Sequence, residues 1–226
     1  MINTKLSFYE QVGVLIPGSI LLFGIMLYVT DLKGIIDKDG FSLGSFGIFA
    51  LLSYAAGHGI AVIGNFVADL LWASRGGLPT SWVIGTAPRL LSAPQLAKLH
   101  DQVESRLGLK IKPLAELSHE EWFPITRQIY TDVNKHGKPD RVDTFNGNYG
   151  LNRGLCAALI VLSTINLFMT TREYMKSVAL VAGALVYLHR TNSFGIHYAR
   201  ELFSQFLSLP PQVSEPRKKP AAKAAP

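Results

Sequence analysis

Four apolar stretches constrain this chain more than any other feature of its sequence. The first, residues 12–29, contains no charged residue. As a helix it would rise about 27 Å, close to the roughly 30 Å thickness of a bilayer core. The others are residues 43–72, 155–171 and 175–189. We therefore predict an all-α fold, a four-span integral membrane helical bundle, although the short last stretch also suits an interfacial helix.

Charged residues concentrate between and after these stretches. Residues 1–75 are predicted to hold spans one and two, and residues 153–190 spans three and four. Residues 76–152 lack a window long enough to span, while helical spacing and a capping-box pattern predict a small helical cytoplasmic insertion. Residues 191–209 repeat apolar positions at helical spacing and predict an amphipathic helix. Residues 210–226 predict a disordered basic tail.

The distribution of Lys and Arg predicts the orientation. One predicted side carries 18 of these residues and the two loops on the other side carry 4. Basic residues favour the cytoplasmic side of a membrane protein, so we expect both termini in the cytoplasm and the chain in a bacterial-type inner (plasma) membrane. The formal charge of +6 arises from residues beside and after the spans, which favours the lipid bilayer over nucleic acid as the partner.

A polar face is predicted along the second apolar stretch, because Tyr54, His58, Asn65 and Asp69 are spaced by four, seven and four residues. Polar groups in hydrocarbon require partners, so this face is expected to turn toward other helices or water. It could line an ion or proton path, with Asp69 at the cytoplasmic mouth. Alternatively, His58 and Asn65 form interhelical hydrogen bonds and Asp69 lies at the interface.

Small residues accompany this polar face. They form two pairs at a spacing of four, Gly57 with Ala61 and Gly64 with Ala68. Such pairs allow helix backbones to approach closely, either within one bundle or between copies. A homo-oligomer is therefore expected.

A second polar run leads into the third apolar stretch. It contains Asn146, Asn148, Asn152 and Arg153 and is expected at the cytoplasmic interface. One interpretation is a polar hinge or ligand contact. The other is that the amides cap helix ends while Arg153 extends toward lipid phosphates.

Catalytic and metal-binding patterns are not found. The sequence lacks a nucleophile elbow, a phosphate-binding loop, a zinc-binding helix and paired cysteines, so we expect no catalytic residue, no metal and no cofactor. A membrane-bound enzyme that acts on lipid is kept as an alternative. It would rely on scattered groups, namely His100, His119, Glu120 and Asp140.

Two short stretches carry a resemblance. The run Ser53-Tyr-Ala-Ala-Gly-His-Gly-Ile-Ala-Val-Ile-Gly-Asn65 and the later pattern Phe145-x-x-x-Tyr149-Gly-x-x-Arg153 resemble uncharacterised small multi-pass bacterial membrane proteins. Some of those proteins are encoded among anti-phage defence genes. The resemblance implies a membrane effector or partner subunit in antiviral defence.

These features together predict a non-enzymatic, oligomeric inner-membrane component. It would act as a membrane-disrupting or conducting effector that forms a pore, or as a subunit that binds a cytoplasmic protein through residues 76–150. A small ion channel or transporter subunit that uses His58, Asn65 and Asp69 directly is the alternative, followed by the lipid enzyme.

Overall fold

The computed structural model describes residues 11–28, 43–168 and 174–210, and these residues form helices and turns without any strand. The all-α prediction is therefore confirmed for the described part of the chain. The predicted tail beyond residue 210 lies outside it. In chain order the elements are η1 (Gln11–Leu15), α2 (Ile16–Tyr28), α3 (Leu43–Ala73), η3 (Pro79–Ser81), α4 (Ala93–Leu107), η4 (Leu114–Glu116), α5 (His119–His136), α6 (Asp140–Phe168) and α7 (Tyr174–Ser208).

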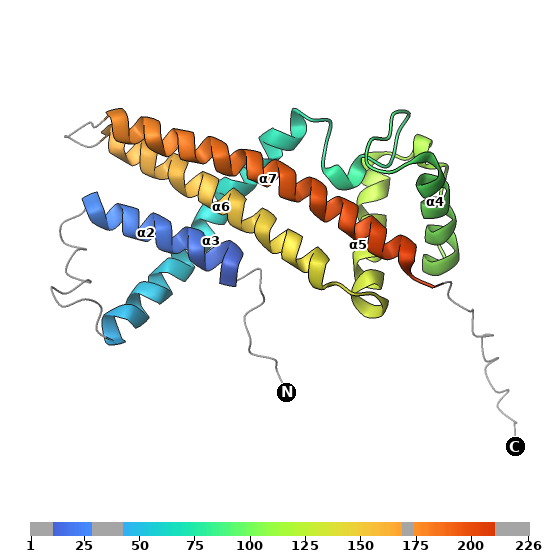
Figure 1. Cartoon of the computed structure of the whole chain (residues 1–226), viewed down its shortest axis with the longest axis horizontal. Coiled ribbons are helices and arrows are strands. Elements are labelled where there is room, and N and C mark those ends of the chain that lie inside the picture. Colours follow the sequence, from blue (N-terminus) through green and yellow to red (C-terminus); the bar gives the residue numbers. More distant parts are fainter. Residues whose placement is uncertain (1–10, 29–42, 169–173, 211–226) are drawn as a thin grey trace, which may run out of the picture.

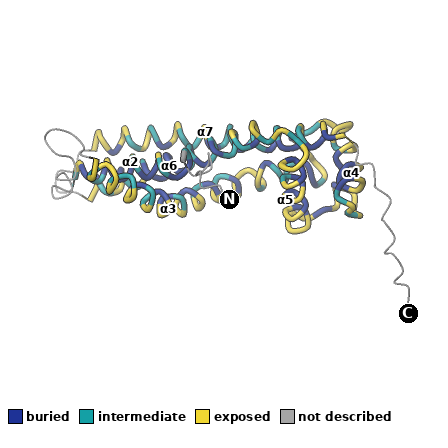
Figure 2. Tube along the Cα trace, turned by 90° about the horizontal axis from the view of Figure 1, so that it is seen from below, coloured by how far each residue is buried: buried dark blue, intermediate teal, exposed yellow. Residues whose placement is uncertain are grey.

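Helices α6 and α7 run side by side along the whole length of the molecule (Figure 1). Helices α2 and α3 pack on one end of this hairpin, and α4 and α5 pack on the other end. We call the first end the apolar half; it comprises residues 11–73, 150–168 and 174–189 where described. The polar half comprises residues 74–149 and 190–210. Figure 2 shows the resulting elongated shape.

Helix α6 is longer than predicted. The sequence predicted a third span that begins at residue 155 and an insertion that ends at residue 152, but the structure joins parts of both in one helix, Asp140–Phe168. Two amides of the polar run lie inside the helix and bond to carbonyls one turn earlier. Asn148 Nδ2 donates to the Thr144 carbonyl oxygen at 2.9 Å, and Asn152 Nδ2 donates to that of Asn148 at 2.6 Å.

Helix α7 likewise joins the predicted fourth span to the predicted amphipathic helix. Polar side chains at the transition again bond to carbonyls one turn earlier, Thr191 to Tyr187 at 2.8 Å and Ser193 to His189 at 3.2 Å. Two continuous helices therefore connect the apolar half to the polar half.

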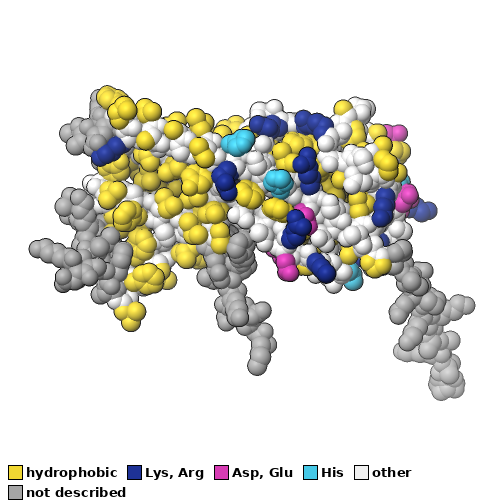
Figure 3. Space-filling model, in the orientation of Figure 1, with side chains coloured by type: hydrophobic (Ala, Val, Ile, Leu, Met, Phe, Trp, Pro, Cys, Tyr) yellow, Lys and Arg dark blue, Asp and Glu magenta, His cyan; other side chains and the backbone are white. Residues whose placement is uncertain are grey.

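The surface of the apolar half is hydrophobic (Figure 3). Among the described residues, all of the exposed large hydrophobic side chains except Leu78 and Phe123 lie on this half. Helices α3 and α6 are long and apolar enough to cross a membrane by length and composition. Only 17% of the most apolar stretch of α3 is buried, unlike the core helix of a soluble protein. Both helices are compatible with membrane insertion; the fourfold span prediction is not confirmed.

Glycines lie at the contacts of η1 and α2 with α3. A Cβ added to Gly18 would overlap the Ser53 carbonyl oxygen on α3, and one added to Gly57 would overlap the Val14 carbonyl oxygen. The apolar half is therefore packed through backbone-to-backbone contact, as expected for helices that gain little from excluding lipid.

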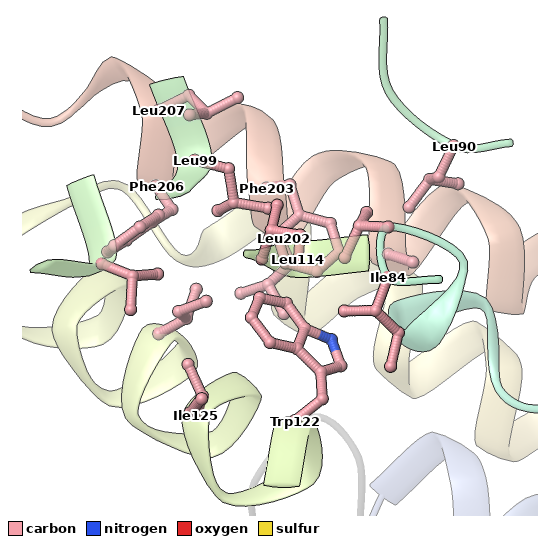
Figure 4. Close-up of a cluster of buried hydrophobic side chains, with 14 of the residues drawn as sticks. Ile84, Leu90, Leu99, Leu114, Trp122, Ile125, Leu202, Phe203, Phe206 and Leu207 are labelled. Atoms are coloured by element: carbon pink, nitrogen blue, oxygen red, sulfur yellow. The ribbon is translucent and has the colours of Figure 1, made fainter. Parts of the chain in front are cut away.

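The polar half has a conventional hydrophobic core (Figure 4). Trp122 of α5 is fully buried and packs near Phe203 of α7, with ring centroids 6.2 Å apart. Helix α4 closes this core and supplies donors to the end of α7: Gln102 Nε2 donates to the Phe206 carbonyl oxygen at 2.7 Å, and Arg106 donates to the Pro210 carbonyl oxygen. Side chains of α4 thus bond to one carbonyl in the last turn of α7 and to one just after the helix.

Candidate functional site on the outer face of helix α3

Helix α3 has two distinct faces in the apolar half. The face that packs on α2, α6 and α7 repeats every three to four residues and consists of Ser53, Gly57, Ile60, Gly64, Ala68 and Trp72. The opposite face is exposed along the whole helix. Another molecule can therefore reach only the side chains of α3 that point away from its neighbouring helices.

The predicted polar residues lie on the exposed side. His58, Asn65 and Asp69 are exposed, and Tyr54 is half-buried. The Tyr54 and His58 rings meet edge to face with centroids 4.6 Å apart. Neither Asn65 nor Asp69 has a hydrogen-bond or ion-pair partner among the described residues. Within one chain, this face thus turns away from the other helices rather than toward them.

Two further small residues lie on this exposed side. Ala55 and Gly59 are exposed and are spaced by four residues, and a Cβ added to Gly59 would meet no atom within 4 Å. We call the side formed by Ala55, His58, Gly59, Val62, Asn65, Phe66 and Asp69 the outer face. The sequence already held this signal, because the Ala55 and Gly59 pair has the same spacing as those singled out.

The small residues singled out from the sequence serve packing within the chain. Gly57, Gly64 and Ala68 are buried and Ala61 is half-buried. A Cβ on Gly64 would lie 3.2 Å from the Arg153 carbonyl oxygen, so Gly64 lets α6 approach α3. These small residues therefore serve helix packing within a single copy of the chain.

The polar run of α6 divides between two places. Asn152 is buried and accepts a hydrogen bond from Arg190 Nε of α7 at 3.1 Å. The Arg153 guanidinium lies over the Tyr149 ring, 5.2 Å from its centroid. Asn146 instead lines a cavity at the boundary of the two halves. None of the three amides caps a helix end, because all lie inside α6.

Sequence reasoning missed a buried polar cluster near the far end of the apolar half. The Tyr28 hydroxyl donates to Asn166 Oδ1 at 3.1 Å, and Asn166 Nδ2 donates to Ser177 Oγ at 2.7 Å. This cluster joins α2, α6 and α7. Its only sequence signal is an asparagine inside an apolar stretch, and its partners are distant in the chain.

The residues of the lipid-enzyme alternative are not brought together. His100 lies in α4, His119 and Glu120 begin α5, and Asp140 begins α6. No hydrogen bond or ion pair joins any two of them in the described ranges. Over the same residues, no group of three His, Cys, Asp or Glu side chains is placed to hold a metal ion.

Comparison with protein-family models, curated proteins and solved structures found no match for this chain.

Proposed function

We propose that this chain is a non-enzymatic inner-membrane component that assembles as a homo-oligomer through the outer face of α3. The observation that carries the proposal is the exposure of Asn65 and His58 on the apolar half of the molecule. Exposing polar side chains to hydrocarbon without a hydrogen-bond partner is unfavourable in free energy, so we expect another molecule to contact this surface.

A second copy of the chain suits this surface. An amide both donates and accepts hydrogen bonds, so Asn65 of one copy pairs with Asn65 of another in the same membrane orientation. Ala55 and Gly59 on the same face permit close approach of two α3 helices. The polar side chains of the outer face therefore require a partner, and its small residues let a second copy of the chain approach closely.

The topology proposed for the oligomer has four spans. In this proposal η1 with α2 and the first half of α7 join α3 and α6 in the bilayer. Among described residues, the basic side chains lie on the polar half apart from Arg153 at its edge and Lys176 at the far end. The positive-inside tendency then puts the polar half and both termini in the cytoplasm.

Two activities are open to this assembly. Outer faces that gather around a centre would put His58, Asn65 and Asp69 along a polar path, which suits a conducting or membrane-disrupting effector and equally a small channel. The polar half, residues 76–150 in particular, would bind the cytoplasmic protein that controls it. The resemblance to proteins encoded among defence genes supports the effector.

Cysteine cross-linking in native membranes tests the assembly. The only cysteine, Cys156, is buried and is replaced by serine. Gly59→Cys should then give disulfide-linked dimers on mild oxidation, while Phe23→Cys on the exposed side of α2 should not. Dimers at both positions, or at neither, would contradict assembly through the outer face.

A steric variant gives a second measurement. Gly59→Leu should abolish the oligomer and leave the monomer folded, because its side chain meets nothing within the chain. Gly47→Leu is the matched control, since Gly47 also lies in open space on α3. Size determination in detergent should show a smaller particle for Gly59→Leu alone.

Membrane potential tests the activity. Bacteria that express the wild-type chain should depolarise, and Asp69→Asn and Asn65→Ala at matched membrane levels should not. If depolarisation persists in both variants, the outer face is not the conducting path, and neither the effector nor the channel form of the proposal survives.

A further inference from the structure

A cavity of about 510 Å³ lies where the apolar half meets the polar half, and the proposed oligomer does not use it. We call it the junction pocket. Its walls come from the end of α3, from η3, and from α5, α6 and α7. Trp72 contributes from the buried side of α3, opposite the outer face.

The wall around Trp72 is tightly packed. Its indole Nε1 donates to the Tyr149 hydroxyl at 3.0 Å, and its ring meets the Trp82 ring edge to face at 6.1 Å. A Cβ on Gly195 would lie 2.6 Å from Trp72 Cζ2, so this position of α7 must be small for the indole to fit. The pocket therefore has a fixed aromatic side before any ligand arrives.

Two exposed apolar side chains line the pocket and could contact an apolar group. Leu78 and Phe123 are the exposed large hydrophobic residues of the described polar half, and both line the junction pocket. On a half whose other large apolar residues are covered, an exposed pair at a cavity indicates a place for an apolar group.

Three side chains with available donors line the same cavity. Arg127 is the one charged residue among the lining side chains; its guanidinium lies 5.7 Å from the Phe123 ring centroid and forms no ion pair with a described residue. The Asn146 amide and the Tyr198 hydroxyl likewise make no hydrogen bond in the described part of the chain. Burial raises the pKa of Tyr198 to about 12, so its hydroxyl keeps its proton.

One carboxylate lies behind the lining. Asp143 Oδ1 accepts a hydrogen bond from the Tyr130 hydroxyl at 2.9 Å, and Asp143 is not among the lining residues, although its charge adds to the raised pKa of Tyr198. The lining itself thus presents one positive charge, two neutral donors and aromatic walls. A single negative charge on an apolar body matches this set.

We propose that the junction pocket binds an amphipathic monoanion, a molecule with one carboxylate or phosphate group on an apolar body. The anion lies against Arg127, Asn146 and Tyr198, and the body lies against Trp72, Leu78 and Phe123. Such a molecule comes either from the bilayer, as an anionic phospholipid, or from solution, as an organic acid. This binding site is separate from the proposed oligomer contact and lies at the boundary of the two halves.

Tryptophan fluorescence of the full chain in nonionic detergent tests this assignment. Two anionic probes are titrated, dihexanoyl phosphatidylglycerol and cyclohexylbutanoate, each against a probe that lacks the anionic group, dihexanoyl glycerol and cyclohexylbutanamide. We expect saturable binding of a charged probe and at least tenfold weaker binding of its uncharged counterpart, because a charge-assisted hydrogen bond is lost.

Variants assign the binding to the pocket. Arg127→Gln should weaken binding of the charged probe about tenfold, Tyr198→Phe should weaken it severalfold, and Arg127→Lys should retain most of it. Arg141→Gln is the matched control, because Arg141 is exposed and pairs with Glu201 at 3.6 Å away from the lining. Helical circular dichroism shows whether each variant is folded.

Each outcome decides the question. Binding that depends on Arg127 and Tyr198 supports the proposal, and the probe that binds more tightly shows whether the source is lipid or solution. Equal binding of charged and uncharged probes, or no loss in folded Arg127→Gln and Tyr198→Phe, overturns it. Gly59→Leu should not alter this binding, which separates the test from that of the oligomer.

Discussion

The two halves of this molecule are stabilised in opposite ways. In the polar half, large side chains such as Trp122 and Phe203 are fully buried and most charged groups face outward. In the apolar half, many large apolar side chains face outward, and glycines such as Gly18 and Gly57 lie at the helix contacts. The same α6 and α7 helices serve both halves.

This contrast is compatible with a different medium around each half, lipid around the apolar half and water around the polar half. In water, burying apolar surface drives packing at roughly 25 cal/mol per Å², so the largest side chains belong inside. In lipid that drive is absent, and close contact between backbones takes its place. The different packing at the two ends of α6 and α7 is thus compatible with membrane insertion of the apolar half.

The largest effect is expected from Trp122→Ala in the polar half. Its indole is fully buried and donates to the Thr80 carbonyl oxygen at 2.7 Å, so the change leaves a cavity and an unpaired acceptor. Unfolding in detergent, followed by circular dichroism, should show a loss of about 3–5 kcal/mol. Gln128→Ala, at an exposed position of α5, should change stability by about 0.5 kcal/mol or less. Similar losses for both would contradict a water-type core.

A buried ion pair in the same half comes next. Arg106 Nε donates to Asp132 Oδ2 at 2.8 Å, and both side chains are buried. Arg106→Ala would leave the carboxylate without this partner and should cost about 3 kcal/mol, whereas the double variant Arg106→Met with Asp132→Leu should recover most of that loss. Lys112→Ala breaks an exposed pair and serves as the control. A double variant as unstable as the single one would mean that the pair itself is essential.

Local sequence signals predicted much of the fold. The capping box at Ser118 and Glu121 marks the observed start of α5, with the Glu121 backbone N–H bonding to Ser118 Oγ at 3.2 Å. The structure has no helix boundary at residues 152–155 or 190–191, where the sequence divided the insertion, the spans and the amphipathic helix. Asn148 and Asn152, for which helix capping was one interpretation, bond inside α6 instead, and Gly154 packs inside the same helix. Their behaviour depends on partners such as Pro17 beside Gly154, which are distant in sequence.

The sequence predicted which residues share the candidate site, but it did not predict whether they face the rest of the chain or the outside. The spacing of His58, Asn65 and Asp69 correctly put them on one side of a helix, but spacing cannot tell which side meets the rest of the chain. That depends on where α2 crosses, which is set by Gly18 on a separate element. The junction pocket was even harder to predict from the sequence, since its walls come from five elements.

A smaller effect is expected from Gly57→Leu in the apolar half. The added side chain would collide with the Val14 backbone, where no flexible side chain can move aside, and overpacking costs about 1–3 kcal/mol. Gly47→Leu on the same helix lies in open space and should have almost no effect. Denaturation in mixed micelles measures both. Equal stability of the two variants would show that α2 does not depend on this close contact.

The smallest effect is expected at the buried amide of the apolar half. Asn166→Leu removes the hydrogen bonds to Tyr28 and Ser177. In a membrane the unfolded helices also find polar partners, so such bonds contribute about 0.6 kcal/mol on average. Denaturation in mixed micelles should therefore show a loss near that value.

The matched change in the polar half is Gln102→Leu, which removes the donor to the Phe206 and Leu209 carbonyl oxygens. Water no longer reaches these acceptors in the folded state, so the loss should be larger, about 1–3 kcal/mol. Two amides of similar chemistry thus report on two media. If Asn166→Leu costs as much as Gln102→Leu, the reference state of the apolar half is water, and the assignment of that half to the bilayer fails.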